Sequence, residues 1–207
     1  MSALSHILEH KVVAILRGMP PAELVNIATA LYDGGIRILE ITLNSPGALP
    51  GISELNHLFK HRLLIGAGTV LDAKDALDAI AAGAEFLISP TTDPKVIRIA
   101  KDAGVVSIPG AYTPTEILAA HNLGADIVKV FPAPDAAYIK NIRGPLDQVR
   151  LMPTGGIDAG NIKSFAEAGA LAFGIGSSLV NSKATINDNY YPELTARAQR
   201  LISSLNS

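Results

Sequence analysis

The sequence predicts a (β/α)₈ (TIM) barrel, and three observations lead to this fold class. Short apolar runs rich in β-branched residues occur eight times along the 207 residues. Segments with helical spacing separate these runs. A glycine closes several of the helical segments and leads directly into the next apolar run, at intervals near 20 residues or near twice that. Such an interval fits one strand–helix unit, and the chain ends after the eighth unit. We therefore prefer a closed barrel to a doubly wound open sheet, although alternation alone does not demonstrate closure.

The predicted strands are the eight apolar runs, in chain order. They comprise residues 12–16, 36–43, 63–67, 85–89, 105–108, 127–131, 149–152 and 171–175. Overall, 48% of the residues are hydrophobic and only 17% are charged. This balance suits a parallel sheet that is buried on both faces.

The predicted helices begin at recognisable signals. Pro20-Pro21 opens the first helical segment, and a further helix, residues 4–10, is expected to plug the base of the barrel. Asp72 and Asp93 are placed to cap later helices, and Thr113 with Glu116 predicts a capping box. Asp158 or Ala159 is expected to open the helix before Gly169. The helix-closing glycines are Gly35, Gly83, Gly104, Gly124 and Gly169.

Composition excludes several classes of function. The chain has no cysteine, so disulfides, thiolate catalysis and cysteine-ligated metals are excluded. A net charge of −2 and an aromatic content of 5% disfavour nucleic-acid binding. No apolar stretch approaches the roughly 20 residues that a membrane helix needs. Because the N-terminal residues do not resemble a signal peptide, we expect residues 1–207 to form a single cytoplasmic barrel domain without membrane or nucleic-acid partners.

Lys129 stands in the middle of an otherwise apolar predicted strand. Alternation puts it on the same face as Ile127 and Phe131, and a barrel interior there would partly desolvate its amine. Desolvation favours the neutral amine, which can attack a carbonyl group. A lysine that snorkels to water, or one held in a buried ion pair, is the structural alternative.

Glu40 is likewise a lone ionisable residue in an apolar run. It follows Gly35 by five residues, as Lys129 follows Gly124, so the two are expected at the same height in the barrel. The pair suggests a nucleophile and a proton shuttle, with a structural ion pair as the alternative. Arg17 ends the first predicted strand and can lower the lysine pKa, clamp a carboxylate, or pair with a loop residue at the rim.

Glycines after the last two strands suggest a phosphate site. Gly155-Gly156 and Gly176-Ser177 allow backbone N–H groups to approach an anion, with a following helix N-terminus adding a positive field. The alternative is that these glycines only form tight turns. The five histidines fall in helical segments away from the predicted rim, so no metal site is expected.

These motifs together resemble the 2-keto-3-deoxy-6-phosphogluconate (KDPG) and 4-hydroxy-2-oxoglutarate (KHG) aldolase family. The matching segments run through most of the chain. They are Ala14-Ile15-Leu16-Arg17, Leu39-Glu40-Ile41-Thr42-Leu43, Ile65-Gly66-Ala67-Gly68-Thr69-Val70, Ile88-Ser89-Pro90, Pro109-Gly110, Lys129-Val130-Phe131-Pro132-Ala133 and Pro153-Thr154-Gly155-Gly156-Ile157.

The resemblance implies a homotrimeric class I aldolase that needs no metal or other cofactor and cleaves KDPG to pyruvate and glyceraldehyde 3-phosphate. It makes Lys129 the Schiff-base lysine and Glu40 the general acid/base. On the matching positions it puts Arg17 and Thr69 at the pyruvate carboxylate and makes Pro90 and Phe131 line the pocket. Thr154 would contact the substrate hydroxyls. The phosphate would be held by Gly155, Gly156 and Ser177.

Asn44-Ser45-Pro46 departs from many phosphogluconate aldolases, which have an arginine after the Glu-Ile-Thr-Leu-like stretch. The Asn-Ser-Pro segment resembles the phosphogalactonate branch of the family. Phosphogalactonate or hydroxyoxoglutarate cleavage is therefore an alternative activity. A barrel that binds a phosphorylated ligand without aldolase activity is the alternative from another class.

Overall fold

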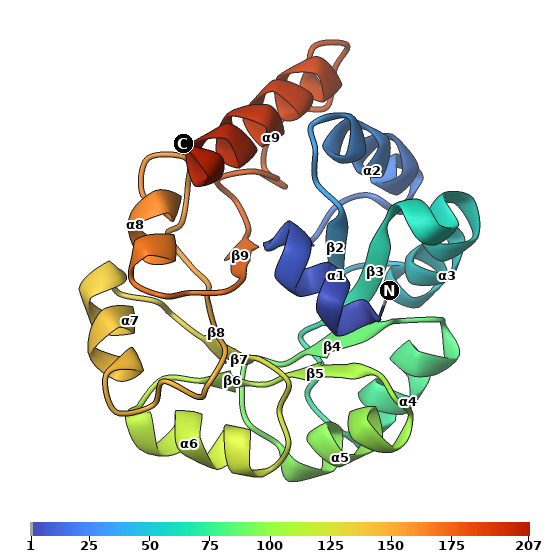
Figure 1. Ribbon diagram of the computed structural model, residues 1–207. Helices are drawn as coiled ribbons and strands as arrows, with labels where there is room; N and C mark the ends of the chain where they lie inside the picture. The colour runs from blue at the N-terminus through green and yellow to red at the C-terminus, as the bar shows by residue number, and fades with distance from the viewer. Residues whose placement is uncertain (1) are drawn as a thin grey trace.

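The computed structural model describes residues 2–207, which form a ring of parallel strands surrounded by helices (Figure 1). The strands are β1 (Val12–Leu16), β2 (Ile38–Thr42), β3 (Leu64–Gly68), β4 (Phe86–Ile88), β5 (Val106–Ile108), β6 (Gly110–Ala111), β7 (Val128–Val130), β8 (Leu151–Pro153) and β9 (Phe173–Ile175). The α-helices are α1 (Ala3–His10), α2 (Leu24–Asp33), α3 (Ala48–Phe59), α4 (Ala73–Ala81), α5 (Pro94–Asp102), α6 (Pro114–Asn122), α7 (Ala136–Arg143), α8 (Ile162–Glu167) and α9 (Tyr190–Asn206), with 3₁₀ turns at Pro21–Glu23 and Lys60–Arg62.

The strands form two parallel sheets rather than one. Six of them pair in the order β5-β4-β3-β2-β1-β9, and three pair as β6-β7-β8. The chain runs directly from β5 through Pro109 into β6, and a single bridge between Thr154 and Gly174 connects the other edges. Proline has no N–H to donate to a ladder, so Pro109 and Pro153 interrupt regular pairing at these edges.

The predicted closed barrel is thus confirmed only in part. The parallel, curled arrangement with helices outside is as expected, but eight strands do not close into one sheet. The two-residue strand β6 was not among the eight apolar runs, because Gly110 and Ala111 are too few to form one. Most predicted strands are longer than the observed ones, whereas β1 has the expected bounds.

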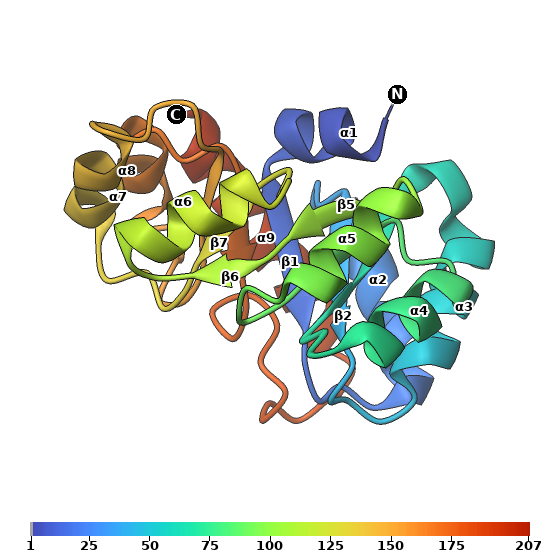
Figure 2. The ribbon, with the colours of Figure 1, turned by 90° about the horizontal axis from the view of Figure 1, so that it is seen from below.

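Helix α1 covers the end of the ring at which the strands begin (Figures 1 and 2). Its Ile7 is fully buried against the first residues of several strands, including Val13, Ile38 and Phe86. This inner cluster is separate from the larger core between the strands and the outer helices. The prediction of a helix at the barrel base is therefore correct, and the opposite end of the ring is left for the loops that follow the strands.

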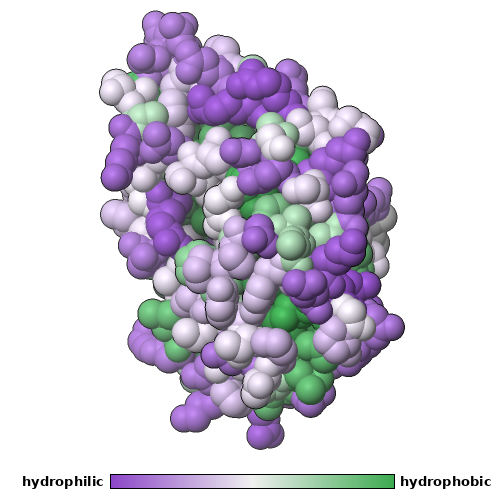
Figure 3. Space-filling model, turned by 90° about the vertical axis from the view of Figure 1, so that its left-hand side faces the viewer, coloured by the Kyte–Doolittle hydropathy of each residue, from purple (hydrophilic) through white to green (hydrophobic). Residues whose placement is uncertain are grey.

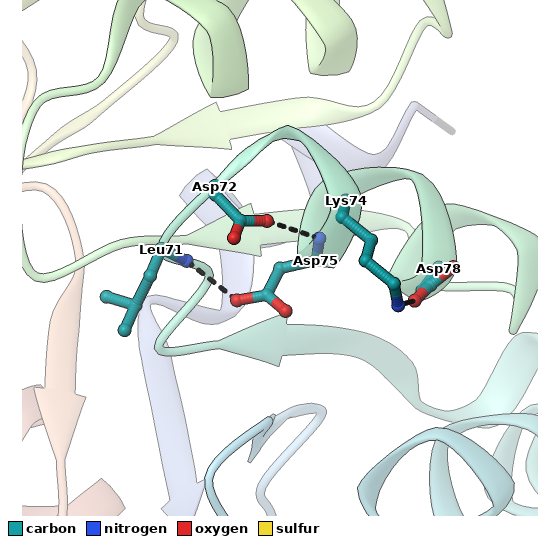
Figure 4. A network of polar contacts seen from close by, with 5 residues as sticks. All are labelled: Leu71, Asp72, Lys74, Asp75 and Asp78. Atoms are coloured by element: carbon teal, nitrogen blue, oxygen red, sulfur yellow. Dashed lines mark hydrogen bonds and ion pairs between the residues drawn. The ribbon is translucent and has the colours of Figure 1, made fainter.

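Most of the expected helix signals are present in the structure. All five helix-closing glycines have positive φ angles. Thr113 and Glu116 form the predicted capping box, and Asp93 caps α5. Figure 4 shows the start of α4, where Asp72 accepts a hydrogen bond from the Asp75 N–H at 2.9 Å and Asp75 accepts one from the Leu71 N–H at 3.1 Å. Nearby, Lys74 pairs with Asp78 along the helix, as the figure also shows.

The expected start of the helix before Gly169 is wrong by a few residues. The helix α8 begins at Ile162, after Asn161. Asp158 instead accepts a hydrogen bond from the Gly160 N–H, and Asn161 accepts one from the Asp158 N–H. These local side-chain bonds hold a turn, which competes with helix formation at this point.

The outer helices bury one side and expose the other. On α7, Ile139 and Ile142 are buried, and on α8, Ile162 and Phe165 are. The face of the molecule on this side of the ring carries hydrophilic residues with smaller hydrophobic areas between them (Figure 3). None of the helices in residues 2–207 is long and apolar enough to cross a membrane.

Candidate active site

Strand alternation brings the predicted catalytic residues to the interior of the ring. On β2, Leu39 and Ile41 pack in the outer core. Ile38 lies in the inner cluster, and Glu40, two residues further along, is on the same face of the strand as Ile38. On β7, the same reasoning puts Lys129 on the face opposite the outward-packed Val128 and Val130. Both ionisable side chains are almost fully removed from water.

Glu40 is a buried carboxyl without a fixed partner. Neither of its oxygens accepts a hydrogen bond from any group in residues 2–207. Burial raises the pKa of Glu40, and the opposing charges of Lys129 and Arg17 reduce that shift. Gly68 of β3 leaves the space that the carboxyl occupies, since a Cβ at that position would lie 1.7 Å from Glu40 Oε1. The side chain therefore stays in the interior as a group able to hold and release a proton.

Lys129 has the environment of an activated amine. Burial lowers its pKa; the charge of Glu40 opposes that shift, and the charge of Arg17 adds to it. The amine lies 5.0 Å from the centre of the Phe131 ring. Within residues 2–207, the side-chain ion pairs up to 4.0 Å do not include Lys129 or Glu40. Lys129 and Glu40 therefore do not form the closed ion pair considered from the sequence, and burial shifts the amine toward its neutral form.

Arg17 extends from the end of β1 toward the loop after β3. Its Nη2 donates to Thr69 Oγ1 at 3.5 Å, which is the long limit of a hydrogen bond. Thr69 has a φ of 56°, and this left-handed conformation is unfavourable for a β-branched residue. Such strain persists only where the surroundings impose it, and it often accompanies a functional position.

A cavity of about 290 Å³ opens at the carboxyl ends of the strands. Most of the predicted site residues line it: Arg17, Lys129, Phe131, Thr154, Gly155, Gly156, Gly176 and Ser177. Glu40 and Thr69 do not line the cavity. Each interacts with a residue that does: Glu40 electrostatically with Lys129, and Thr69 through its hydrogen bond with Arg17. Pro90 lies in a neighbouring cleft, which Phe131 also lines, so the structure does not bring Pro90 into the cavity itself.

The glycine loops leave open space on the cavity wall. A Cβ at Gly156 or Gly176 would meet no atom within 4 Å. Gly156 needs glycine for its φ of 68°, whereas neither φ nor packing demands glycine at Gly176. Beside them, Thr154 Oγ1 is buried without a hydrogen-bond partner in residues 2–207. Exposed backbone and a free hydroxyl on one wall are suited to a polar, anionic group.

A helix N-terminus was expected after both loops; one follows Gly155-Gly156, where α8 begins at Ile162, and none directly follows Gly176. Gly176 is followed by a turn in which the Val180 N–H bonds to the Gly176 carbonyl, and α9 begins only at Tyr190. The helix after Gly155-Gly156 is the short α8. The polar groups of these loops are therefore backbone amides and serine hydroxyls.

Sequence reasoning missed several residues of the cavity. Two of them follow from alternation, because Ile15 lies two residues before Arg17 and Gly174 lies two residues before Gly176. The others come from the loops after β8 and β9, whose course no periodic pattern indicates. The six missed residues are Ile15, Ile157, Gly174, Ser178, Val180 and Ser182.

The histidines lie on helices or the second 3₁₀ turn, as expected, and His6 and His10 are on α1 at the opposite end from the cavity. Within residues 2–207, no group of three or more histidine, aspartate or glutamate side chains gathers in a way that could hold a metal ion.

The buried pair makes a prediction about stability. The pKa of Glu40 is raised above 4.5, so its burial destabilises the fold increasingly as the pH rises above that value. The pKa of Lys129 is lowered below 10.5, so its burial destabilises the fold increasingly as the pH falls below that value. Burial of Glu40 and burial of Lys129 therefore both lower the stability of the fold at pH 7. We expect the double variant Glu40→Gln/Lys129→Met to have a higher Tm at pH 7, each kcal/mol being worth about 2–4 °C in a chain of this size.

Thermal unfolding followed by circular dichroism measures this gain. The share of the gain that comes from Glu40 should disappear as the pH is lowered to 4.5 and below, where the carboxyl is protonated in the folded and unfolded chain alike, whereas the share from Lys129 should remain. A lower Tm for the double variant at pH 7 would mean that the mutual attraction of the two charges outweighs their burial.

Comparison with known proteins agrees with this site. A family model described as KDPG and KHG aldolase matches residues 4–196. A probable 2-dehydro-3-deoxy-6-phosphogalactonate aldolase of Rhizobium meliloti is 38% identical over 83% of this chain and 82% of its own length. A 2-dehydro-3-deoxy-phosphogluconate aldolase of Treponema pallidum is 36% identical over 86% of this chain and 85% of its own.

A solved structure described as native KDPGal superposes with a TM-score of 0.88 at 29% identity and covers 94% of both chains. The relatives therefore divide between the phosphogluconate and phosphogalactonate names, while all share the aldolase reaction class. From its fold, its cavity and these matches, the chain belongs to the KDPG and KHG aldolase family of carbon–carbon lyases.

Proposed function

We propose that this protein is a class I aldolase that cleaves KDPG to pyruvate and glyceraldehyde 3-phosphate through a Schiff base on Lys129. One observation carries the proposal: a desolvated lysine amine and an unpaired, buried carboxyl face the interior of the ring below a cavity. Lowering the pKa of Lys129 favours the neutral amine that adds to a ketone, and raising the pKa of Glu40 favours the protonated carboxyl that acts as an acid.

The reaction begins with addition of the Lys129 amine to the C2 ketone of the substrate. Protonated Glu40 gives its proton to the developing C2 alkoxide, then takes a proton from the nitrogen and passes it to the C2 hydroxyl, directly or through a water molecule, so that Glu40 is left as the carboxylate. Loss of water then gives the iminium ion. A carboxyl buried beside the amine suits this task, because it can give up and regain one proton without exchange with bulk solvent.

The iminium withdraws electrons from the C3–C4 bond. Removal of the proton from the C4 hydroxyl allows that bond to break, and glyceraldehyde 3-phosphate leaves with the new carbonyl group. The electron pair remains on the lysine adduct as an enamine. Protonation at C3 and addition of water then release pyruvate and restore the amine. Atoms and charge balance without an oxidant or a metal, and we propose that no cofactor takes part.

The cavity wall suggests how the substrate lies. We assign the C1 carboxylate to Arg17 and Thr69, because a guanidinium can bind a carboxylate through two hydrogen bonds. Thr154 is assigned to a substrate hydroxyl, since its own hydroxyl is buried and unpartnered. Phe131 forms the apolar wall near Lys129, with Pro90 behind it in the adjacent cleft. The phosphate is assigned to Gly155, Gly156, Gly176 and Ser177.

Gly176 tests the phosphate assignment. Since a Cβ there would meet no protein atom, we expect Gly176→Ala to fold normally and to raise KM for a phosphorylated substrate by roughly tenfold, because the methyl group displaces an anion from the backbone amides. Gly144→Ala is the control, because Gly144 has a helical φ of −55° and ordinary space for a methyl group. Steady-state kinetics would contradict the assignment if both variants had the same KM.

The loop after β2 favours a second candidate substrate, the galactonate isomer. Asn44-Ser45-Pro46 resembles the phosphogalactonate branch, and the Rhizobium meliloti relative carries that name. Both isomers yield pyruvate and glyceraldehyde 3-phosphate, so the mechanism is unchanged. The ratio of kcat/KM for the two C4 epimers, with unphosphorylated 4-hydroxy-2-oxoglutarate as a third substrate, decides between them.

We also propose that residues 1–207 act as one domain and that three copies associate. The proposal of a homotrimer rests on the resemblance to the family. Exposed large side chains, such as Leu71 and Leu77, offer apolar surface for such contacts.

Trapping with pyruvate and borohydride tests the proposed function directly. Borohydride reduces the iminium to a stable secondary amine, and mass spectrometry of the digested protein locates it. We expect one reduced pyruvate adduct, on Lys129. A folded protein without an adduct would reject the aldolase proposal and leave a barrel that binds a phosphorylated ligand.

A further inference from the structure

Two buried hydroxyls connect the loop after β1 to the loop after β2. Ser45 Oγ accepts a hydrogen bond from the Gly18 N–H at 2.8 Å. The same oxygen lies 2.8 Å from Thr42 Oγ1. Thr42 is fully buried at the end of β2, and Ser45 is 9% exposed. A backbone amide of one loop is thus attached, through one serine, to the end of the neighbouring strand.

The direction of the hydrogen bond between Gly18 and Ser45 is determined by the atoms present. The Gly18 N–H can only donate, so Ser45 Oγ accepts there. The hydroxyls of Ser45 and Thr42 form the second hydrogen bond, in which either oxygen can donate. The Ser45 N–H also donates to the Thr42 carbonyl at 2.9 Å, which folds residues 42–45 into a tight turn. Ser45 is consequently held at two points and is a rigid anchor for Gly18.

Gly18 directly follows Arg17, so its attachment also limits where Arg17 can lie. Gly18 has a φ of 64°, at which the chain turns sharply away from β1. A Cβ built on Gly18 would lie 3.8 Å from Ser182 Cβ, which is an ordinary van der Waals distance, so Gly18 lies close to Ser182 as well. Among residues 2–207, in contrast, the tip of the Arg17 side chain hydrogen-bonds only to Thr69, at 3.5 Å. The backbone of the loop therefore does more than the side-chain contact to fix the guanidinium.

We propose that Ser45 is a positioning residue for substrate binding: by anchoring the Gly18 N–H, it holds Arg17 where the substrate carboxylate binds. This inference rests on the proposed function, in which Arg17 contacts that carboxylate. It assigns a role to the Asn-Ser-Pro segment that is independent of which C4 epimer is preferred.

The variant Ser45→Ala removes the anchor and leaves the Gly18 N–H without its side-chain partner. We expect the pyruvate concentration that gives half-maximal borohydride inactivation to rise about tenfold, as for the loss of one part-buried hydrogen bond. We expect kcat for aldol cleavage to change much less, by about threefold or less, because Lys129 and Glu40 keep their positions. Thr42→Val, which keeps the side-chain volume but removes the second hydroxyl, should shift pyruvate half-saturation in the same direction by a smaller factor.

A double-mutant cycle with Arg17→Ala separates positioning from general damage. If Ser45 acts through Arg17, Ser45→Ala has little further effect on pyruvate half-saturation once Arg17 is alanine. Independent, multiplicative effects of the two substitutions would overturn the proposal. So would an unchanged half-saturation in Ser45→Ala.

Thr195→Ala is the matched control for lost stability. Thr195 also uses a part-buried hydroxyl to bond a distant backbone group, the Ala30 carbonyl at 2.9 Å, but on α9 outside the cavity. It should lower Tm and leave pyruvate half-saturation unchanged. Wild-type protein without any pyruvate adduct would reject the proposed function and the role of Ser45 with it, whereas a wild-type adduct with an unaltered Ser45→Ala variant would reject only the latter.

Discussion

Lys129→Met is expected to abolish aldol cleavage, with kcat falling on the order of 10⁵-fold or more, as for removal of a covalent nucleophile. Methionine fills a similar volume in the buried position but has no amine to form the iminium. Without the iminium, the electrons of the C3–C4 bond have no acceptor. A coupled assay for pyruvate release measures the rate, and borohydride trapping should give no adduct at this position.

Lys140→Met is the control for this substitution. Lys140 is exposed on α7, so the variant removes one amine from the surface and should keep wild-type kinetics. Turnover by Lys129→Met near the wild-type rate would rule out the Schiff-base mechanism at this residue. Retention of the fold is checked by Tm, which burial of an uncharged side chain should not lower.

Glu40→Gln is expected to lower kcat by about 10²–10⁴-fold, the range for loss of a positioned acid/base. Glutamine has nearly the same shape and fits beside Gly68, but it cannot transfer a proton. Dehydration to the iminium and protonation of the enamine should both slow. The borohydride adduct on Lys129 should still form, only more slowly.

The pH–rate profile gives a second test of Glu40. Burial raises the pKa of Glu40, so the wild-type profile should contain a carboxyl limb shifted upward from 4.5, and Glu40→Gln should lose it. Glu54→Gln, on the exposed side of α3, should leave both the rate and the profile unchanged. A profile unaltered by Glu40→Gln would make Glu40 a structural residue.

The sequence predicted the local structure well because the signals for it are local. The capping box at Thr113 and Glu116, and the five glycines that end helices, depend on residues within one turn. The helix before Gly169 was placed too early because Asp158 and Asn161 can cap a helix or hold a turn, and these outcomes differ little in local energy.

Alternation within strands predicted which side chains share a face, and the structure confirms that Glu40 and Lys129 are buried on the side opposite the outward-packed residues of β2 and β7. Closure was harder to predict, because it depends on pairing between strands that are far apart in sequence. Pro109 and the single bridge from Thr154 to Gly174 divide the ring into two sheets. Pro90 was assigned to the pocket, but the structure separates it into the neighbouring cleft, since the loop after β4 follows a path that no periodicity indicates.

The sequence by itself determined the order of strands and helices, the two lone ionisable residues on interior faces, and the glycine-rich loops that follow the last strands. These features depend on periodicity and on short-range conformational preference. Only the tertiary structure decided that both oxygens of Glu40 lack a hydrogen-bond partner within residues 2–207, that Gly176 lines the cavity, and that Ser45 bonds to the Gly18 N–H. Each of these depends on distances between segments that only packing brings together, and no local pattern in the chain encodes such a distance.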